Sequence, residues 1–158
     1  MTNEHHYSAT VRWTGNLGSG TSAYNSYSRN HEVSAPGKTA PIAGSSDRHF
    51  RGDAARYNPE ELLVAALSQC HMLAYLHLCA TNSIVVEAYE DEAGGTMILG
   101  KDGSGHLTEV NLHPVVTVSP ESDTTLAHEL HHEAHRLCFI ANSVNFTVTH
   151  RPRVEARR

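Results

Sequence analysis

The feature that most constrains the fold of this chain is a long apolar segment, residues 62–80, which follows a strong helix-start signal. Asn58 can cap a helix, Pro59 suits its first position, and two acidic residues follow in the first turn. Apolar residues then point in nearly every direction, which is typical of a buried helix. About 22 residues of helix span about 33 Å. We therefore expect this helix, running to about residue 80, to form the centre of the fold or of a dimer.

The rest of the chain reads as strands and one further helix. That helix is predicted over residues 124–140, after the start signal Pro120-Glu121-Ser122-Asp123. Strand patterns cover residues 8–14, 24–33, a short segment near Ile42, 84–92, 96–99, 106–119 and 144–150. This order predicts an α+β fold, with mostly antiparallel sheet packed on two helices. A chain of 158 residues is expected to form one domain, residues 1–158, with a solvated basic tail at 151–158.

Composition argues against several classes of function. A formal net charge of −5 gives no support for nucleic acid as a partner. No window reaches about 18 uninterrupted apolar residues, so we expect no membrane span. The N-terminal residues have neither the basic nor the apolar part of a signal peptide. We therefore expect a cytoplasmic protein without a bound cofactor, whose three cysteines are in a reducing compartment.

The string AHELHHEAHRLCF, residues 127–139, fits the zinc metalloprotease signature H-E-x-x-H through His128, Glu129 and His132. Cys138 stands where a third metal ligand would be expected. On a helical wheel, however, His128 and His132 lie opposite the apolar side that contains Cys138. We favour a polar helix surface that uses histidine, with a zinc hydrolase as the alternative.

The cysteines offer a different chemistry. Cys138 lies on the apolar side of the second helix, and Cys70 lies midway along the first. Two helices packed at about 8–10 Å would let these sulfurs meet. Cys79, nine residues after Cys70, faces the opposite way and is interpreted as packing. From the pattern alone, two buried apolar thiols are the commonest outcome.

A sequence resemblance favours a redox function. Residues 58–72, NPEELLVAALSQCHM, resemble the first-cysteine motif of the OsmC/Ohr family, the osmotically inducible and organic hydroperoxide resistance proteins. Residues 134–138, AHRLC, are similar to its second-cysteine motif. The resemblance implies an intertwined homodimer, with sheets wrapped around two long central helices and each active site at the subunit interface. It also implies a thiol peroxidase that reduces organic hydroperoxides and is recycled by a dithiol such as a lipoyl-protein.

The same resemblance implies roles for individual residues. Cys70 would attack the peroxide and Cys138 would resolve the resulting sulfenic acid as a disulfide. An ordinary thiol titrates near about 8.5, so a nearby cation is required. In the family this is an arginine held by a glutamate that matches Glu60. We favour Arg51 and then Arg29 for that arginine. A non-catalytic binding or stress protein on the same fold is the alternative function.

Overall fold

The fold is described from a computed structural model that covers residues 2–158. The chain forms two compact units, one ending at Leu62 and the other running from Leu63 to Arg158. The single domain expected over residues 1–158 stays a prediction.

The first unit contains a small antiparallel sheet in the order β1-β2-β3. Its elements are β1 (Thr10–Trp13), β2 (His31–Ser34), β3 (Ile42–Gly44) and the short 3-10 helix η1 (Arg48–Phe50). The strands predicted at 8–14 and near Ile42 are confirmed, but the one predicted at 24–33 is present only at its end. Its first part is a turn, because the Ser26 hydroxyl accepts from the Ala23 amide and donates to the Gly20 carbonyl.

Helix α1 (Pro59–Thr81) begins where the sequence predicts. The Asn58 side chain accepts from the Glu61 amide at 2.8 Å, and the Glu61 carboxylate accepts from the Asn58 amide at 3.1 Å. This reciprocal capping box satisfies two amides that the first turn would leave open. Because Glu61 takes the capping role, the carboxylate of Glu60 remains available for another partner.

The burial of α1 differs from the sequence prediction. Only one side of the helix is buried, at Leu67, His71, Tyr75 and Cys79, which follow one another at four-residue intervals. Leu73, on another side, is 60% exposed. The most apolar 18-residue window has a mean hydropathy of 1.5, so α1 could cross a membrane by length and composition, a test that core helices of soluble proteins also pass. Only 22% of that window is buried, so the helix is not enclosed by its own chain.

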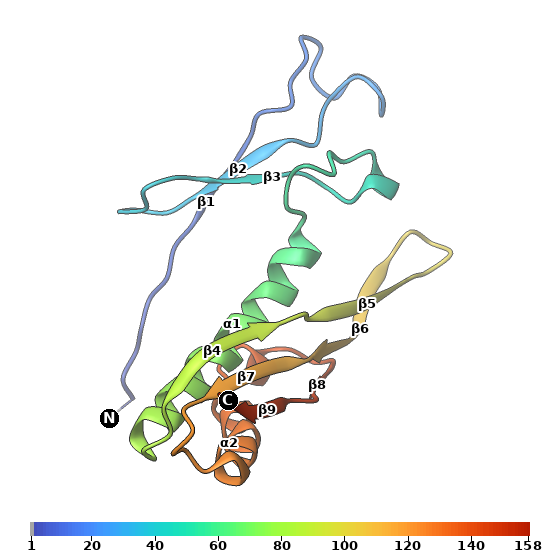
Figure 1. The fold of residues 1–158 in the computed structure, drawn as a ribbon. Coiled ribbons are helices and arrows are strands. Elements are labelled where there is room, and N and C mark those ends of the chain that lie inside the picture. The colour runs from blue at the N-terminus through green and yellow to red at the C-terminus, as the bar shows by residue number, and fades with distance from the viewer. Residues whose placement is uncertain (1) are drawn as a thin grey trace. The chain divides into compact units, whose positions relative to one another are not determined.

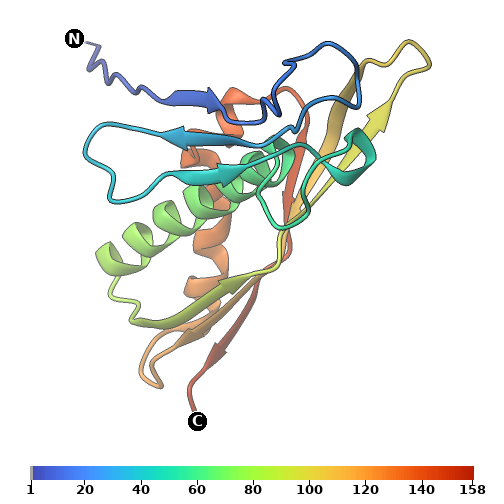
Figure 2. The same ribbon diagram turned by 90° about the horizontal axis from the view of Figure 1, so that it is seen from above.

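The second unit combines two three-stranded sheets, β4-β7-β9 and β5-β6-β8, with the helices. Its further elements are β4 (Val86–Asp91), β5 (Gly94–Leu99), β6 (Gly105–Leu112), β7 (Pro114–Val118), α2 (Thr124–Leu137), η2 (Ala141–Ser143), β8 (Thr147–His150) and β9 (Arg153–Ala156). In Figure 1, β4 continues in line into β5, and β6 into β7. Figure 2 shows both helices on one side of these strands. The α+β class and the antiparallel majority are confirmed, although β8 and β9 pair parallel to β6 and β7.

Two predictions for the C-terminal half of the chain are wrong. The strand predicted over 106–119 is divided between β6 and β7, which belong to different sheets. The division falls at His113, whose amide donates to the Asp91 carboxylate at 2.6 Å, and at Pro114, which has no amide hydrogen to donate. The basic tail at 151–158 is not simply solvated, because it contains β9, and Val154 packs against the core.

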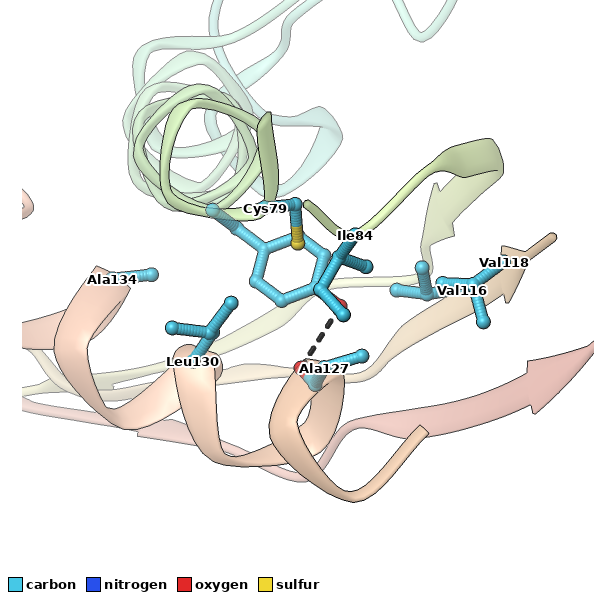
Figure 3. Packing of buried hydrophobic residues seen from close by; sticks show 8 residues of the cluster. Cys79, Ile84, Val116, Val118, Ala127, Leu130 and Ala134 are labelled. Carbon is cyan, nitrogen blue, oxygen red and sulfur yellow. Dashed lines mark hydrogen bonds between the residues drawn. The ribbon is translucent and has the colours of Figure 1, made fainter. Parts of the chain in front are cut away.

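The main core lies between α1, α2 and β7. Its buried members are Tyr75, Cys79, Ile84, Val116, Val118, Ala127, Leu130 and Ala134. Figure 3 shows Cys79 and Ile84 facing Ala127 across this core, and the dashed line is the hydrogen bond of 2.9 Å from the Tyr75 hydroxyl to the Ala127 carbonyl. A smaller core contains Leu67, Val110 and Leu112. Cys79 is therefore a packing residue, as the sequence predicts.

Candidate active site

Cys70 lies on α1 away from the main core and is half-buried. It lines a cavity of about 540 Å³ in the second unit. The other lining residues are Ala66, Gln69, Leu73, Ala74, His77, Leu137, Phe139 and Ile140. Most of these side chains are apolar, so the cavity offers an apolar molecule direct access to the Cys70 sulfur.

Cys138 is held by the turn that ends α2. The sequence predicts this helix to about residue 140, but it ends at Leu137, and Cys138 has an extended backbone with ψ of 106°. The Asn142 side chain donates to the Arg136 carbonyl at 3.1 Å, which satisfies an acceptor at the helix end. The Ala141 amide donates to the Cys138 sulfur at 3.4 Å. These contacts fix a thiol that is only 1% exposed.

Cys70 and Cys138 are neighbours. Burial, together with the nearby Cys70 thiol, raises the pKa of Cys138 to about 11. Cys138 is therefore a protonated thiol at neutral pH. All three cysteines are free thiols, and burial also raises the pKa of Cys79 in the core. The arrangement pairs one accessible thiol with one buried thiol, which is what a thiol–disulfide cycle requires.

Glu60 and Arg29 share a second cavity, of about 350 Å³, within the first unit. It is lined by Trp13, Tyr27, Arg29, His31, Ser45, Ser46, Asp47, Phe50, Pro59 and Glu60. One carboxylate oxygen of Glu60, Oε2, is buried and has no hydrogen-bond partner within residues 2–158. A buried carboxylate is unfavourable without a partner, so this cavity suits a cation close to Glu60.

Two tyrosines that sequence reasoning missed hold the Arg29 guanidinium. Its Nη1 and Nη2 donate to the carbonyls of Tyr27 and Tyr24, both at 2.7 Å. Its Cζ lies 4.0 Å from the ring centre of Tyr27 and 4.4 Å from that of Tyr24. Cation–π contacts of this kind restrict an otherwise mobile side chain. The signal was in the sequence, where both tyrosines stand within five residues of the arginine.

Arg51 occupies a different place from Arg29. It follows η1 in a left-handed conformation with φ of 62°, and its side chain is exposed. Its Cζ lies 5.9 Å from the ring centre of Tyr24, and it does not line the cavity that contains Glu60. Of the two arginines that the sequence suggests, Arg29 is the one that shares a cavity with the glutamate.

The zinc hydrolase alternative finds no support in the geometry. His128 and His132 line a cleft of about 400 Å³ together with His135 and His150, but the exposed Glu129 does not line it. Across residues 2–158, no group of three or more His, Cys, Asp or Glu side chains is arranged to hold a metal ion. The H-E-x-x-H string therefore lacks both a ligand set and a glutamate directed into the cleft.

Comparison with known proteins identifies the family. The family model described as OsmC-like protein matches residues 52–152. A solved structure of an OsmC-like protein of unknown function from Vibrio cholerae is 36% identical, with a TM-score of 0.85, and the match covers 95% of this chain and 100% of that chain. This chain belongs to the OsmC/Ohr family. The resemblance of the two cysteine motifs is thereby confirmed.

More distant OsmC/Ohr structures share the fold. An organic hydroperoxide resistance protein from Elizabethkingia anophelis is 19% identical with a TM-score of 0.69, over 99% of this chain and 100% of that chain. One from Legionella pneumophila is also 19% identical, with a TM-score of 0.66, over 96% of this chain and 99% of that chain. No curated protein sequence matches the chain.

Proposed function

We propose that this OsmC/Ohr protein is a thiol peroxidase that reduces organic hydroperoxides. The Cys70 thiolate attacks the distal peroxide oxygen, the O–O bond breaks, and the alcohol leaves after taking up a proton. The resulting sulfenic acid condenses with the Cys138 thiol, which forms a disulfide and releases water. A dithiol reductant, in the form of a lipoyl-protein, then returns both cysteines to thiols by exchange.

One observation carries this proposal: the accessible Cys70 opens on an apolar cavity while its neighbour Cys138 is buried. The raised pKa of Cys138 keeps it protonated and suits it to resolve rather than to attack. The apolar lining suits the organic part of an alkyl hydroperoxide better than hydrogen peroxide. Two structural relatives are named organic hydroperoxide resistance proteins, which supports the same substrate class.

Peptide mapping after oxidation tests the proposal. We expect one equivalent of tert-butyl hydroperoxide to produce a crosslink between the peptides of Cys70 and Cys138. Cys79 should stay reduced because it is buried in the core, and it should be alkylated once the protein is unfolded. Mass spectrometry of the digested protein reads both results. A protein that consumes no peroxide and forms no such crosslink would instead be a non-catalytic binding or stress protein on the same fold.

Arg29 is proposed as the cation that favours the Cys70 thiolate, with Glu60 as its carboxylate partner. Arg29 lines the same cavity as Glu60, whose buried Oε2 has no partner within residues 2–158, and the family resemblance assigns such an arginine to the attacking cysteine. Replacing Arg29 by glutamine should lower kcat/KM for the peroxide about 100-fold, a loss typical of one charged stabilising group. Arg51→Gln is the matched variant and should retain activity within about 3-fold. Steady-state peroxide consumption compares them, and the reverse order would assign the role to Arg51.

We also propose that the protein is a cytoplasmic homodimer. The exposed Leu73 and the low burial of the apolar window of α1 support a second copy packed against this helix, since water is a poor environment for such a surface. The proposal includes no resident cofactor or metal, and neither nucleic acid nor a membrane as a partner.

A further inference from the structure

A buried contact between two histidines joins the helices that carry the cysteines. His71 follows Cys70 on α1, and His131 lies on α2 seven residues before Cys138, which directly follows the end of that helix. The Nε2 atom of His71 and the Nδ1 atom of His131 are 3.0 Å apart and share a hydrogen bond. The two rings are 0% and 1% exposed. The histidine pair therefore links α1, directly beside Cys70, to the helix that leads into Cys138.

Tyr75 adds a second link one turn further along α1. Its hydroxyl donates to the Ala127 carbonyl at 2.9 Å, and its ring stacks on that of His131 with centres 3.8 Å apart. Within residues 2–158, these two hydrogen bonds are the ones that connect α1 side chains to α2. A disulfide needs Cα atoms about 4.4–6.8 Å apart, so the spacing of the helices decides whether it can form.

We propose that the His71–His131 hydrogen bond is a positioning contact that keeps Cys70 and Cys138 at disulfide-forming distance, and that protonation of the pair releases it. The hydrogen bond needs one imidazole nitrogen to accept. When both rings are protonated, both nitrogens are donors and two positive charges face each other inside the protein. This role deepens the proposed function and rests on it, since the disulfide is an intermediate of that cycle.

The surroundings of the pair favour its neutral form. Burial, together with the charge of neighbouring histidines, lowers the pKa of His71 to about 4 and that of His131 to about 3. The titratable side chains that face the pair are Tyr75 from α1, His128 and His135 from α2, and His150 from β8. None of them is a carboxylate that could stabilise a proton on the pair.

The equilibrium between the 70–138 dithiol and its disulfide tests the positioning role without any peroxide. Oxidised and reduced dithiothreitol set the potential: the protein thiols give two electrons and two protons to oxidised dithiothreitol. His131→Phe keeps a ring against Tyr75 but removes the hydrogen bond, and should lower the equilibrium constant for disulfide formation about 10-fold at pH 7.5. Glu129→Gln, at an exposed position of the same helix that does not face the pair, should leave it unchanged. If H131F does not fold, H71Q replaces it and should give a smaller decrease, because an amide can still bond to His131.

The proton linkage is tested on the wild-type protein, which needs no variant. NMR titration of the His71 and His131 ring protons is compared between the dithiol and disulfide forms. Because linkage is reciprocal, the disulfide should make the pair harder to protonate and lower its apparent pKa values. Identical titrations, or a variant equilibrium equal to that of E129Q, would overturn the inference. If the wild-type protein forms the 70–138 disulfide normally but shows no peroxidase activity, only the proposed function is refuted.

Discussion

Replacing Cys70 by serine is expected to lower the rate of hydroperoxide reduction by about 1000-fold or more. The serine hydroxyl occupies nearly the same volume at the wall of the apolar cavity, so binding of an organic hydroperoxide should change little. A hydroxyl is almost never ionised at neutral pH, however, whereas a thiol can be made a thiolate by a neighbouring cation. The measurement is peroxide consumption with a dithiol reductant under identical conditions for both proteins.

Two further cysteine variants make this result specific. Cys79→Ala should retain the wild-type rate per folded molecule, because Cys79 belongs to the core beside Tyr75. Cys138→Ser should complete a single turnover and accumulate a sulfenic acid on Cys70, which a dimedone adduct would reveal by mass. Activity in C70S, or its loss in C79A without loss of folded protein, would contradict the assignment of Cys70 as the attacking residue.

Acid is expected to destabilise the protein strongly between pH 6.5 and pH 5. His71 and His131 have folded-state pKa values of about 4 and about 3, below their ordinary value of 6.5. In this pH range these two histidines bind protons in the unfolded chain but stay neutral in the folded protein. The free energy of unfolding that they contribute above pH 6.5 is therefore lost as the pH falls. Each pH unit below 6.5 removes up to about 1.4 kcal/mol per histidine, so the pair removes up to about 4 kcal/mol by pH 5. Urea unfolding at several pH values measures this slope.

A matched histidine on the same helix serves as the control. His77 is exposed on α1, so His77→Gln should reproduce the wild-type slope between pH 6.5 and pH 5. Asp47, Asp102 and Glu133 have lowered pKa values through local hydrogen bonds, but they begin to titrate only near or below their ordinary values of 3.8–4.5. A free energy of unfolding that stays constant from pH 7 to pH 5 would contradict the neutral buried pair.

The sequence predicted the features that depend on local patterns. The start of α1 followed from Asn58 and Pro59, and the opposite orientations of Cys70 and Cys79 followed from helical periodicity. The α+β class followed from the order of the elements, and two cysteine motifs identified the family. These signals are contained in short windows, where one residue's neighbours determine its conformation or its direction.

The features that the sequence did not predict depend on contacts between distant segments. The strand β9 looked like a basic tail because four of the eight residues at 151–158 are arginine, and it forms through pairing with β7. The one-sided burial of α1 was missed because apolar residues lie all round this helix, and such a pattern does not indicate which side the rest of the chain covers. The hydrogen bonds that hold the Arg29 guanidinium depend on the turn that contains Tyr24, which was expected to be a strand.

The order of strands in the two sheets has a consequence for how the protein is made. Each sheet of the second unit takes its third strand, β8 or β9, from residues 147–156. During synthesis, β4 to β7 therefore emerge from the ribosome with an edge still open on both β6 and β7. Such edges can pair with other chains, so a ribosome paused before residue 147 should present a nascent chain that depends on chaperones.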